Sequence, residues 1–164
     1  MNTSRLMIVM ADARWTQAAL HLACAMSRRE QAELLLLKML PVRHPLLLGT
    51  AGGSLSFTAV DARLLELMAM TAEDYGIPLE IRRCQYANYW NAVVDAAGQF
   101  SVTAVLIQIP PSPIPYWSKY RRWWLHRQLA RQRQHLLTLD DLAPSLTYTP
   151  TITLSDDIAT LFDH

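Results

Sequence analysis

Residues 32–40 read Ala-Glu-Leu-Leu-Leu-Leu-Lys-Met-Leu, an apolar run of strand length that Pro41 ends. A second such run, Arg-Leu-Met-Ile-Val-Met, occupies residues 5–10. Both runs are continuous rather than alternating, which is typical of strands that helices cover on both faces. Between them, apolar residues return every three or four positions over residues 15–26, which predicts a helix. The first forty residues therefore predict a β-α-β unit with parallel strands.

The same alternation continues, after a loop at residues 41–56, as far as residue 109. Apolar residues recur with helical spacing over residues 60–75. Gly76-Ile77-Pro78 predicts the end of that helix, because glycine accepts a left-handed backbone and proline prevents continuation. Residues 79–83 predict a third strand near a sheet edge. Asn88 predicts the start of a third helix that extends to residue 100, and residues 102–109 predict a fourth buried strand.

Composition limits the class of protein. The chain has 164 residues, the usual size of one domain. Half of the residues are apolar and 18% are charged, which excludes a disordered chain. The most apolar stretch, residues 32–48, is interrupted by charged residues and prolines, so no run approaches the roughly 18 residues of a membrane span. The first residues enter a strand-like run without a signal-peptide pattern. We expect a soluble, unprocessed protein.

Residues with reactive or metal-binding side chains are scattered. Cys24 and Cys84 lie in apolar segments without a second cysteine at ligand spacing. We expect two reduced core thiols, which favours a cytoplasmic location. No two of the five histidines lie three or four residues apart, so no metal site is expected. No serine, histidine and aspartate stand in a nucleophile-elbow context, and no catalytic residue is predicted.

Several of these segments resemble the universal stress proteins. Ala19-Leu20, Ala32-Glu33-Leu34 and Leu37-Lys38-Met39-Leu40-Pro41-Val42 are similar to that family's first helix and its A-E-L-x-L-L-H-V strand. Asn91-Ala92-Val93-Val94 followed by Val105-Leu106-Ile107 is similar to its third helix and D-L-I-V-M-G strand. The resemblance covers residues 5–140. It implies an α/β fold with an open, mostly parallel five-stranded sheet and helices on both faces, a doubly wound, Rossmann-like three-layer sandwich. It also implies a role in the stress response.

The chain departs from the family where ATP would bind. ATP-binding members carry a glycine motif, G-x2-G-x9-G-[S/T], directly after the fourth strand. Its four places fall here on Ile109, Ser112, Arg122 and Trp123. The loop itself reads Pro110-Pro111-Ser112-Pro113-Ile114-Pro115. Proline has no N–H and cannot adopt a positive φ, so this loop cannot form the family's amide cradle.

The first strand departs from the family as well. The aspartate that faces adenosine in the family falls on Ala11, and Asp12 is one residue late. We therefore expect no ATP binding by the family's mechanism and no cofactor, with a nucleotide as the open alternative.

Positive charge follows the proline loop. No acidic residue lies between Asp95 and Asp140, although the net charge of the whole chain is only +1. The basic residues of this interval are Lys119, Arg121, Arg122, Arg127, Arg131 and Arg133. On a helical projection one side carries Trp117, Tyr120, Trp124, Leu125 and Leu129. The other side carries Lys119, Arg122, His126 and Arg133, with Trp123 between the two sides.

The plain interpretation of this segment is a fourth helix with its apolar side on the sheet and its basic side in water. The alternative is an anion or nucleotide pocket in which Arg121 or Arg122 replaces the missing amides, with Asp12 and Lys119 as further candidate ligands. Nucleic-acid binding is not expected, because the basic stripe is short and the net charge is low. Binding to a membrane surface is disfavoured, because the apolar side is needed to cover the sheet.

The end of the chain suggests self-association. Residues 135–139 predict a fifth strand, which in the family often pairs across a homodimer. We expect residues 1–140 to form the domain and residues 141–164 to be an extension, part of the same unit or a dimer contact. Residues 148–154 have β-type composition broken by Pro150, as in an edge strand. The extension is acidic, and our hypothesis is that it lies over its own or a partner's surface, against the basic helix.

The sequence thus predicts a non-catalytic, universal-stress-protein-like binding or regulatory module, a homodimer formed through the last strand and the extension. Two alternatives stay open. The first is a regulatory domain for a transporter or signalling partner, which only the family resemblance suggests. The second is a nucleotide- or phosphate-binding enzyme that uses the Arg121/Arg122 region.

Overall fold

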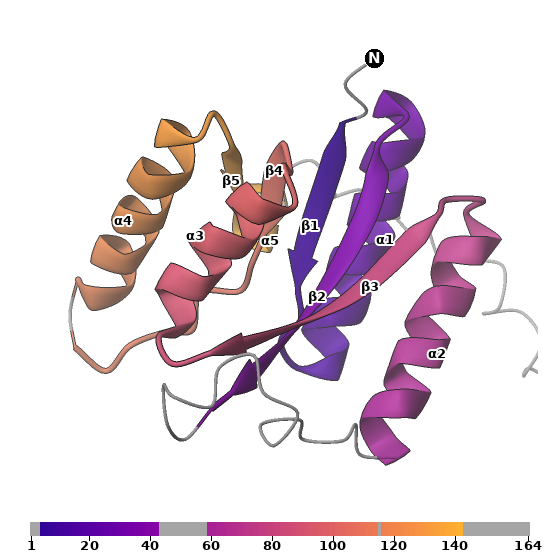
Figure 1. The fold of residues 1–164 in the computed structure, drawn as a ribbon, viewed down its shortest axis with the longest axis horizontal. Coiled ribbons are helices and arrows are strands. Elements are labelled where there is room, and N and C mark those ends of the chain that lie inside the picture. Colours follow the sequence, from indigo (N-terminus) through magenta and orange to yellow (C-terminus); the bar gives the residue numbers. More distant parts are fainter. Residues whose placement is uncertain (1–3, 43–58, 115, 143–164) are drawn as a thin grey trace, which may run out of the picture.

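The computed structural model describes residues 4–42, 59–114 and 116–142. Within these residues, five parallel strands form one sheet in the order β3-β2-β1-β4-β5 (Figure 1). The elements in chain order are β1 (Arg5–Val9), α1 (Ala13–Glu30), β2 (Glu33–Pro41), α2 (Ala59–Asp74), β3 (Leu79–Tyr86), α3 (Tyr89–Gln99), β4 (Ala104–Leu106), α4 (Trp117–Arg131), β5 (His135–Leu137) and α5 (Leu139–Leu142). The predicted fold class, an open parallel sheet between two helical layers, is confirmed.

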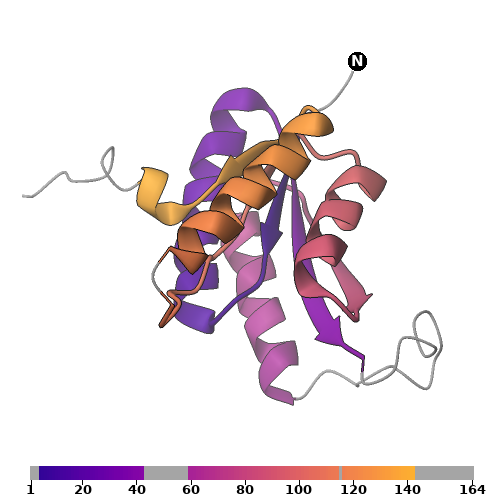
Figure 2. The same cartoon turned by 90° about the vertical axis from the view of Figure 1, so that its left-hand side faces the viewer.

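Each helical layer consists of helices that are consecutive along the chain. Helices α1 and α2 cover one face of the sheet, and α3 and α4 cover the other (Figures 1 and 2). The period of two along β1 separates the two cores, because Leu6 and Ile8 face α1 and α2 whereas Met7 and Val9 face α3 and α4. Burial on both faces explains why the central strands read as continuous apolar runs.

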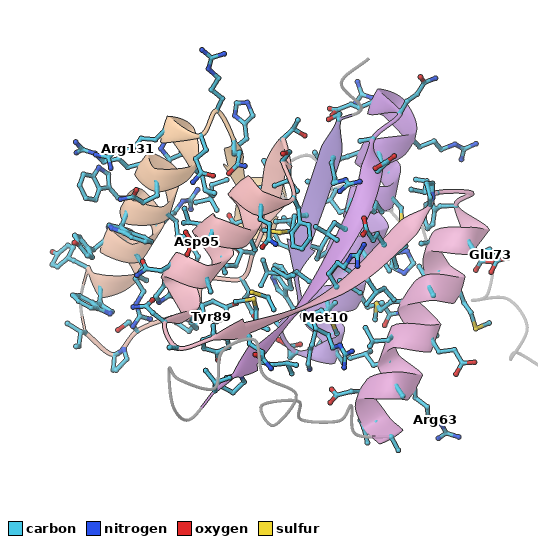
Figure 3. The ribbon with its side chains drawn as sticks, in the orientation of Figure 1. Met10, Arg63, Glu73, Tyr89, Asp95 and Arg131 are labelled. Carbon is cyan, nitrogen blue, oxygen red and sulfur yellow. The ribbon has the colours of Figure 1, made fainter. Side chains whose placement is uncertain are left out.

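Charged side chains lie on the outer sides of α2 and α4. Arg63 and Glu73 of α2 and Arg131 of α4 point away from the sheet, on opposite sides of the molecule (Figure 3). Among the described helices, none is long and apolar enough to cross a membrane.

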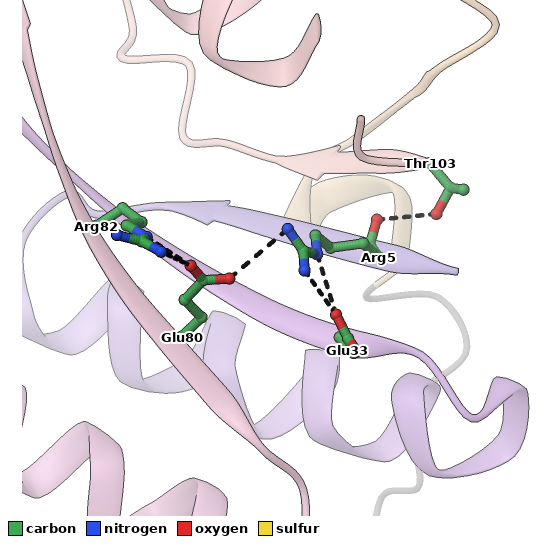
Figure 4. Close-up of polar contacts among 5 residues, drawn as sticks. All are labelled: Arg5, Glu33, Glu80, Arg82 and Thr103. Carbon is green, nitrogen blue, oxygen red and sulfur yellow. Dashed lines mark hydrogen bonds and ion pairs between the residues drawn. The ribbon is translucent and has the colours of Figure 1, made fainter. Parts of the chain in front are cut away.

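An ion-pair network joins β1, β2 and β3. The Arg5 guanidinium donates to Glu33 Oε2 at 2.7 Å and lies 3.6 Å from Glu80 Oε2, and Arg82 also pairs with Glu80 (Figure 4). Since Arg5 is the register partner of Glu33, the network supports the pairing of β1 with β2. These pairs are partly exposed, so their contribution to stability is modest, about 1 kcal/mol or less each.

The helix boundaries follow the sequence signals. Gly76 has φ +69°, and the Ile77 N–H donates to the Ala72 carbonyl at 3.0 Å, which closes α2 with a Schellman-type turn. Asn88 is the N-cap of α3, and its Oδ1 accepts from the Asn91 N–H at 3.3 Å. Both predicted boundaries are confirmed, and β3 lies at a sheet edge as predicted.

Three expectations need correction. Strand β4 is confined to three residues rather than residues 102–109, although Val102 and Ile107 on either side of it are buried. Strand β5 is also shorter than predicted, because the chain turns into α5 at Leu139. The expectation that the apolar side of α4 lies on the sheet is wrong in part, because Trp117 and Tyr120 are 42% and 51% exposed. The predicted strand-like segment at residues 148–154 lies outside the described residues.

Only the leucine side of α4 faces the sheet. Leu125 and Leu129 are fully buried, whereas Trp124 is half-buried. The rings at positions 117, 120 and 123 stack on one another instead of on the sheet. This exposed aromatic surface is the largest departure from the sequence-based expectation.

Candidate functional site

The strand order reverses between β1 and β4, which are neighbours in the sheet although α1, β2, α2, β3 and α3 separate them in the chain. In open parallel sheets, ligands bind beyond the carboxyl ends of the strands at such a point. Here the loop after β1 leads into α1, and the proline loop after β4 leads into α4. These two loops are therefore the expected place for a ligand.

A cavity of about 500 Å³ lies at this position, and we call it the strand-end cavity. Its lining comes from the start of α1, the loop after β4, the first turns of α4, and α5 with the residue before it. The lining residues are Trp15, Ile107, Gln108, Ile109, Pro111, Ser118, Lys119, Arg122, Thr138, Leu139 and Asp140. Its volume is within the range of about 300–1,000 Å³ that is usual for small-molecule sites.

The charged groups of the strand-end cavity come from two helices. Lys119 and Arg122 lie three residues apart on α4, so both reach the same side of the helix. Asp140, in α5, lines the cavity as well. The arrangement offers two cations for an anionic group and one carboxylate that can accept hydrogen bonds from hydroxyl groups.

The loop after β4 presents few backbone donors. Over residues 110–114, only Ser112 and Ile114 carry an N–H group. The Ile114 N–H already donates to Ser112 Oγ at 3.3 Å. Helix α4 then begins at Trp117, and its N-cap residue, Tyr116, has φ +68° and makes no side-chain capping hydrogen bond. Charged side chains rather than loop amides are therefore the main polar groups that this part of the cavity offers.

Asp12 has a local structural role. Its Oδ1 accepts from the Trp15 N–H at 2.9 Å, which makes Asp12 the N-cap of α1. Asp12 does not line the strand-end cavity, whereas its neighbour along the helix, Trp15, does. The structure thus separates Asp12 from Lys119 and Arg122.

Arg121 points to a different place from Arg122. Its guanidinium lies over the Trp90 ring at 5.5 Å and the Trp117 ring at 5.6 Å from the centroids. These groups line a second cavity of about 240 Å³ between α3 and α4, which we call the α3–α4 cavity. Of the four predicted site residues, the structure brings only Lys119 and Arg122 together.

Tyr86, Tyr89 and Trp90 form an aromatic cluster at the carboxyl end of β3. The Tyr89 ring makes edge-to-face contacts with both neighbours, at centroid distances of 5.3 and 5.0 Å. Burial, and then the neighbouring Tyr86, raise the pKa of Tyr89 to about 12. All three rings pack against the core between the sheet, α3 and α4, and Trp90 also lines the cavity with Arg121.

Both cysteines are free thiols with weak acidity. Burial raises the pKa of Cys24 to about 11. Burial and then Asp95 raise the pKa of Cys84, which is half-buried on the edge strand β3 rather than fully buried as predicted. The thiol forms dominate near pH 7, so neither side chain is activated as a nucleophile. No group of three potential metal ligands occurs among the described residues.

Sequence reasoning missed five polar or aromatic residues of the strand-end cavity, namely Trp15, Gln108, Ser118, Thr138 and Asp140. One signal was present for Asp140, since it is the first acidic residue after a long basic interval. The other four carry no distinguishing pattern in the sequence, because they reach the cavity from separate segments of the chain.

The sequence matches no protein-family model and no curated protein. Solved structures, in contrast, resemble the fold. A universal stress protein from Burkholderia pseudomallei is 13% identical, with a TM-score of 0.54 over 82% of this chain and 94% of that one. One from Archaeoglobus fulgidus, solved in complex with dAMP, is 13% identical, with a TM-score of 0.55 over 84% of this chain and 98% of that one. Another, solved in complex with cAMP, is 13% identical, with a TM-score of 0.53 over 82% and 94%. The chain therefore has the fold of the universal stress proteins, as the sequence resemblance implied.

Proposed function

We propose that this chain is a non-catalytic, universal-stress-protein-like binding module whose strand-end cavity takes a small phosphate-bearing ligand, held by the side chains of Lys119 and Arg122. The observation that carries the proposal is the convergence of these two cations on one cavity at the point where the strand order reverses. A nucleoside monophosphate is the ligand class that we favour.

Three features of the cavity and two solved structures support a sugar phosphate as the ligand. Ser118 and Lys119 belong to the first turn of α4, where the helix dipole attracts negative charge, and no side chain caps that turn. The two basic side chains can donate charge-assisted hydrogen bonds to phosphate oxygens. Asp140 can accept hydrogen bonds from a sugar. Two proteins of the same fold were solved with nucleoside monophosphates, dAMP and cAMP.

The proposal differs from glycine-loop binding in what holds the phosphate. Glycine loops grip a triphosphate with several backbone N–H groups, whereas the described loop residues here include three prolines. Two side-chain cations balance the charge of one phosphate group better than that of a triphosphate. We therefore expect AMP and cAMP to bind more tightly than ATP.

The test is a thermal-shift and calorimetric titration of the wild-type chain with AMP, cAMP, ATP and inorganic phosphate. At a ligand concentration a hundredfold above Kd, the chain should gain about 2.7 kcal/mol, which corresponds to a rise in Tm of several degrees. Replacing both Lys119 and Arg122 with alanine should weaken AMP binding at least tenfold, since a charged hydrogen bond contributes about 1.5–3 kcal/mol.

Arg121→Ala is the matched control, because Arg121 lies on the same helix and contacts the other cavity. It should leave AMP binding unchanged. An absence of any shift with all four ligands would refute the anion site. Equal binding by the wild type and the double variant would show that the ligand binds elsewhere. Release of phosphate or adenosine from a bound nucleotide would favour the enzymatic alternative.

The proposal includes a cytoplasmic homodimer. Both described cysteines are free, which is consistent with a reducing compartment. Strand β5 ends the sheet on one side, and such an edge can pair with a second copy. The opposite edge, β3, carries Glu80, Arg82 and Arg83, and charged edges oppose pairing. Light scattering should give twice the chain mass, and a monomer at micromolar concentration would contradict this part of the proposal.

A further inference from the structure

The outer side of α4 carries an exposed stack of aromatic rings, which we call the aromatic ladder. It consists of Trp117, Tyr120 and Trp123, which are 42%, 51% and 53% exposed. Their ring centroids are 5.6 and 5.9 Å apart, with interplanar angles of 25° and 34°. Large exposed apolar side chains that gather on one helix commonly mark a contact surface. None of the three rings lines the strand-end cavity, so the proposed ligand site gives the aromatic ladder no role.

Arginine side chains lie over both ends of the aromatic ladder. Arg121 lies over Trp117 at 5.6 Å, and Arg127 lies over Trp123 at 5.5 Å. The ring faces are therefore largely used within the chain, and the ring edges remain for a partner. This arrangement disfavours single-stranded nucleic acid, which needs free ring faces for base stacking. It suits apolar side chains that pack against ring edges, together with carboxylates that pair with the guanidinium groups.

The α3–α4 cavity adjoins the aromatic ladder. Trp117, Tyr120 and Arg121 line it together with Asn88, Trp90, Asn91 and Trp124. Its volume of about 240 Å³ is below the usual range for small-molecule sites, roughly 300–1,000 Å³. A single apolar side chain of a docked segment suits this size better than a complete ligand does.

The chain itself contains a segment with the required chemistry. Residues 155–163 read Ser-Asp-Asp-Ile-Ala-Thr-Leu-Phe-Asp. Ile158, Leu161 and Phe162 have the i, i+3, i+4 spacing of a helix that docks through one apolar side. Ser155 followed by two aspartates is a typical helix start. The segment carries three aspartates and no lysine or arginine, opposite in charge to α4.

The connecting chain is long enough for this contact. The described part of the chain ends with α5, and Asp140 of α5 lines the same cavity as Lys119 and Arg122 of α4. Residues 143–154 can span about 40 Å when extended. Helix α4, with 15 residues, is only about 22 Å long. The tail can therefore reach any part of the aromatic ladder from its own α5.

We propose that residues 155–163 dock as an amphipathic helix on the aromatic ladder of their own chain. Phe162 or a neighbouring apolar side chain fills the α3–α4 cavity, and the aspartates lie near Arg121 and Arg127. This contact goes beyond the proposed ligand site and does not depend on it. It makes the outer side of α4 an internal surface rather than a docking site for other molecules.

The test uses a fluorescent peptide of residues 151–164 and full-length chains. In Ile158→Ser/Phe162→Ser, the chain's own tail can no longer dock, so the added peptide should bind. The wild type should bind the peptide at least tenfold more weakly, because a tethered segment has an effective concentration of the order of 1 mM. Leu146→Ser/Tyr148→Ser is the matched control in the same tail, and it should behave like the wild type. Fluorescence anisotropy measures each affinity.

Two further variants locate the contact. Adding Trp117→Ala/Trp123→Ala to the tail variant should abolish peptide binding, whereas adding Leu67→Ala/Met70→Ala, which removes two exposed side chains of α2, should not. Equal peptide affinity for wild type and tail variant would overturn the proposal. A wild-type dimer that the tail substitutions dissociate would overturn it too, since the tail would then dock on a second copy. So would a tail variant that binds phosphatidylglycerol vesicles or oligouridine but not the peptide.

Discussion

Replacing Leu129 with alanine should loosen α4 more than it loosens the rest of the chain. Helix α4 has only two fully buried side chains, Leu125 and Leu129, and both pack in the core between α3, α4 and the sheet. Burying a leucine contributes about 1.5–3 kcal/mol, so the pair contributes about 3–6 kcal/mol to the attachment of α4. A Leu→Ala substitution in a core costs about 2.7–5 kcal/mol, which is comparable to that whole attachment.

The expected result is local opening of α4. A loss of about 3 kcal/mol raises the population of the open form by roughly a hundredfold. Hydrogen exchange of the α4 amides should accelerate by this factor in Leu129→Ala, while the amides of β1 and β2 change much less. Native-state exchange followed by mass spectrometry measures both sets of amides in one experiment. Because Lys119 and Arg122 lie on α4, AMP affinity should fall as well.

Leu20→Ala is the matched control. Leu20 is also fully buried, but it lies on α1, which buries six residues against the other face of the sheet. Its loss should lower the stability of the whole domain in urea without selective exchange in α4. If Leu129→Ala accelerated exchange equally in α1 and α4, the idea that two leucines hold α4 would be refuted.

Two further substitutions test single groups. Asp12→Ala removes the acceptor of the Trp15 N–H and should lower the free energy of unfolding, measured in urea, by about 1 kcal/mol. Asp12→Asn keeps an acceptor and should stay close to wild type. A loss of AMP affinity at unchanged stability would instead make Asp12 a ligand. Burial raises the pKa of Cys24 to about 11, above its ordinary value of 9.0. As the pH rises, the unfolded state loses the thiol proton before the folded state does. The free energy of unfolding of the wild type should therefore decline between about pH 9 and pH 11. Cys24→Ala should lack this part of the decline in urea titrations across that range, and parallel pH profiles for the two chains would contradict the assignment.

Much of the fold could be predicted because local and global signals agree. The continuous apolar runs at residues 5–10 and 32–40 became the two central strands, since strands covered on both faces have no polar side. Gly76 and Asn88 marked helix boundaries through backbone chemistry that needs no tertiary context. The edge strand β3 could be distinguished from the central strands because it carries more charged side chains than any of them.

The incorrect predictions have two physical causes, and the first is that hydrophobicity reports burial rather than hydrogen bonding. Val102 and Ile107 are buried as the prediction required, yet only Ala104–Leu106 belong to β4. In α4, tryptophan and tyrosine were counted with leucine on the apolar side. The Trp117 and Tyr120 rings tolerate water and stack on each other, so only the leucines are fully buried and Trp124 packs beside them.

The candidate site could be predicted only in part. Lys119 and Arg122 are one helical turn apart, so a shared direction follows from their spacing. Arg121 is offset from Arg122 by about 100° around the helix and therefore contacts a different cavity. Asp140 reaches the strand-end cavity through the turn into α5, which no sequence pattern indicated.

The basic residues in and around α4 give this nearly neutral chain an uneven charge distribution. Six of the fifteen basic residues fall in the acid-free interval around α4, which leaves nine against all fourteen acidic residues elsewhere. Despite its net charge of +1, the protein should therefore have a sizeable electric dipole moment and should adsorb to cation-exchange resin through one side. At low ionic strength, copies should orient head to tail, so salt concentration will govern its colloidal behaviour more than pH does.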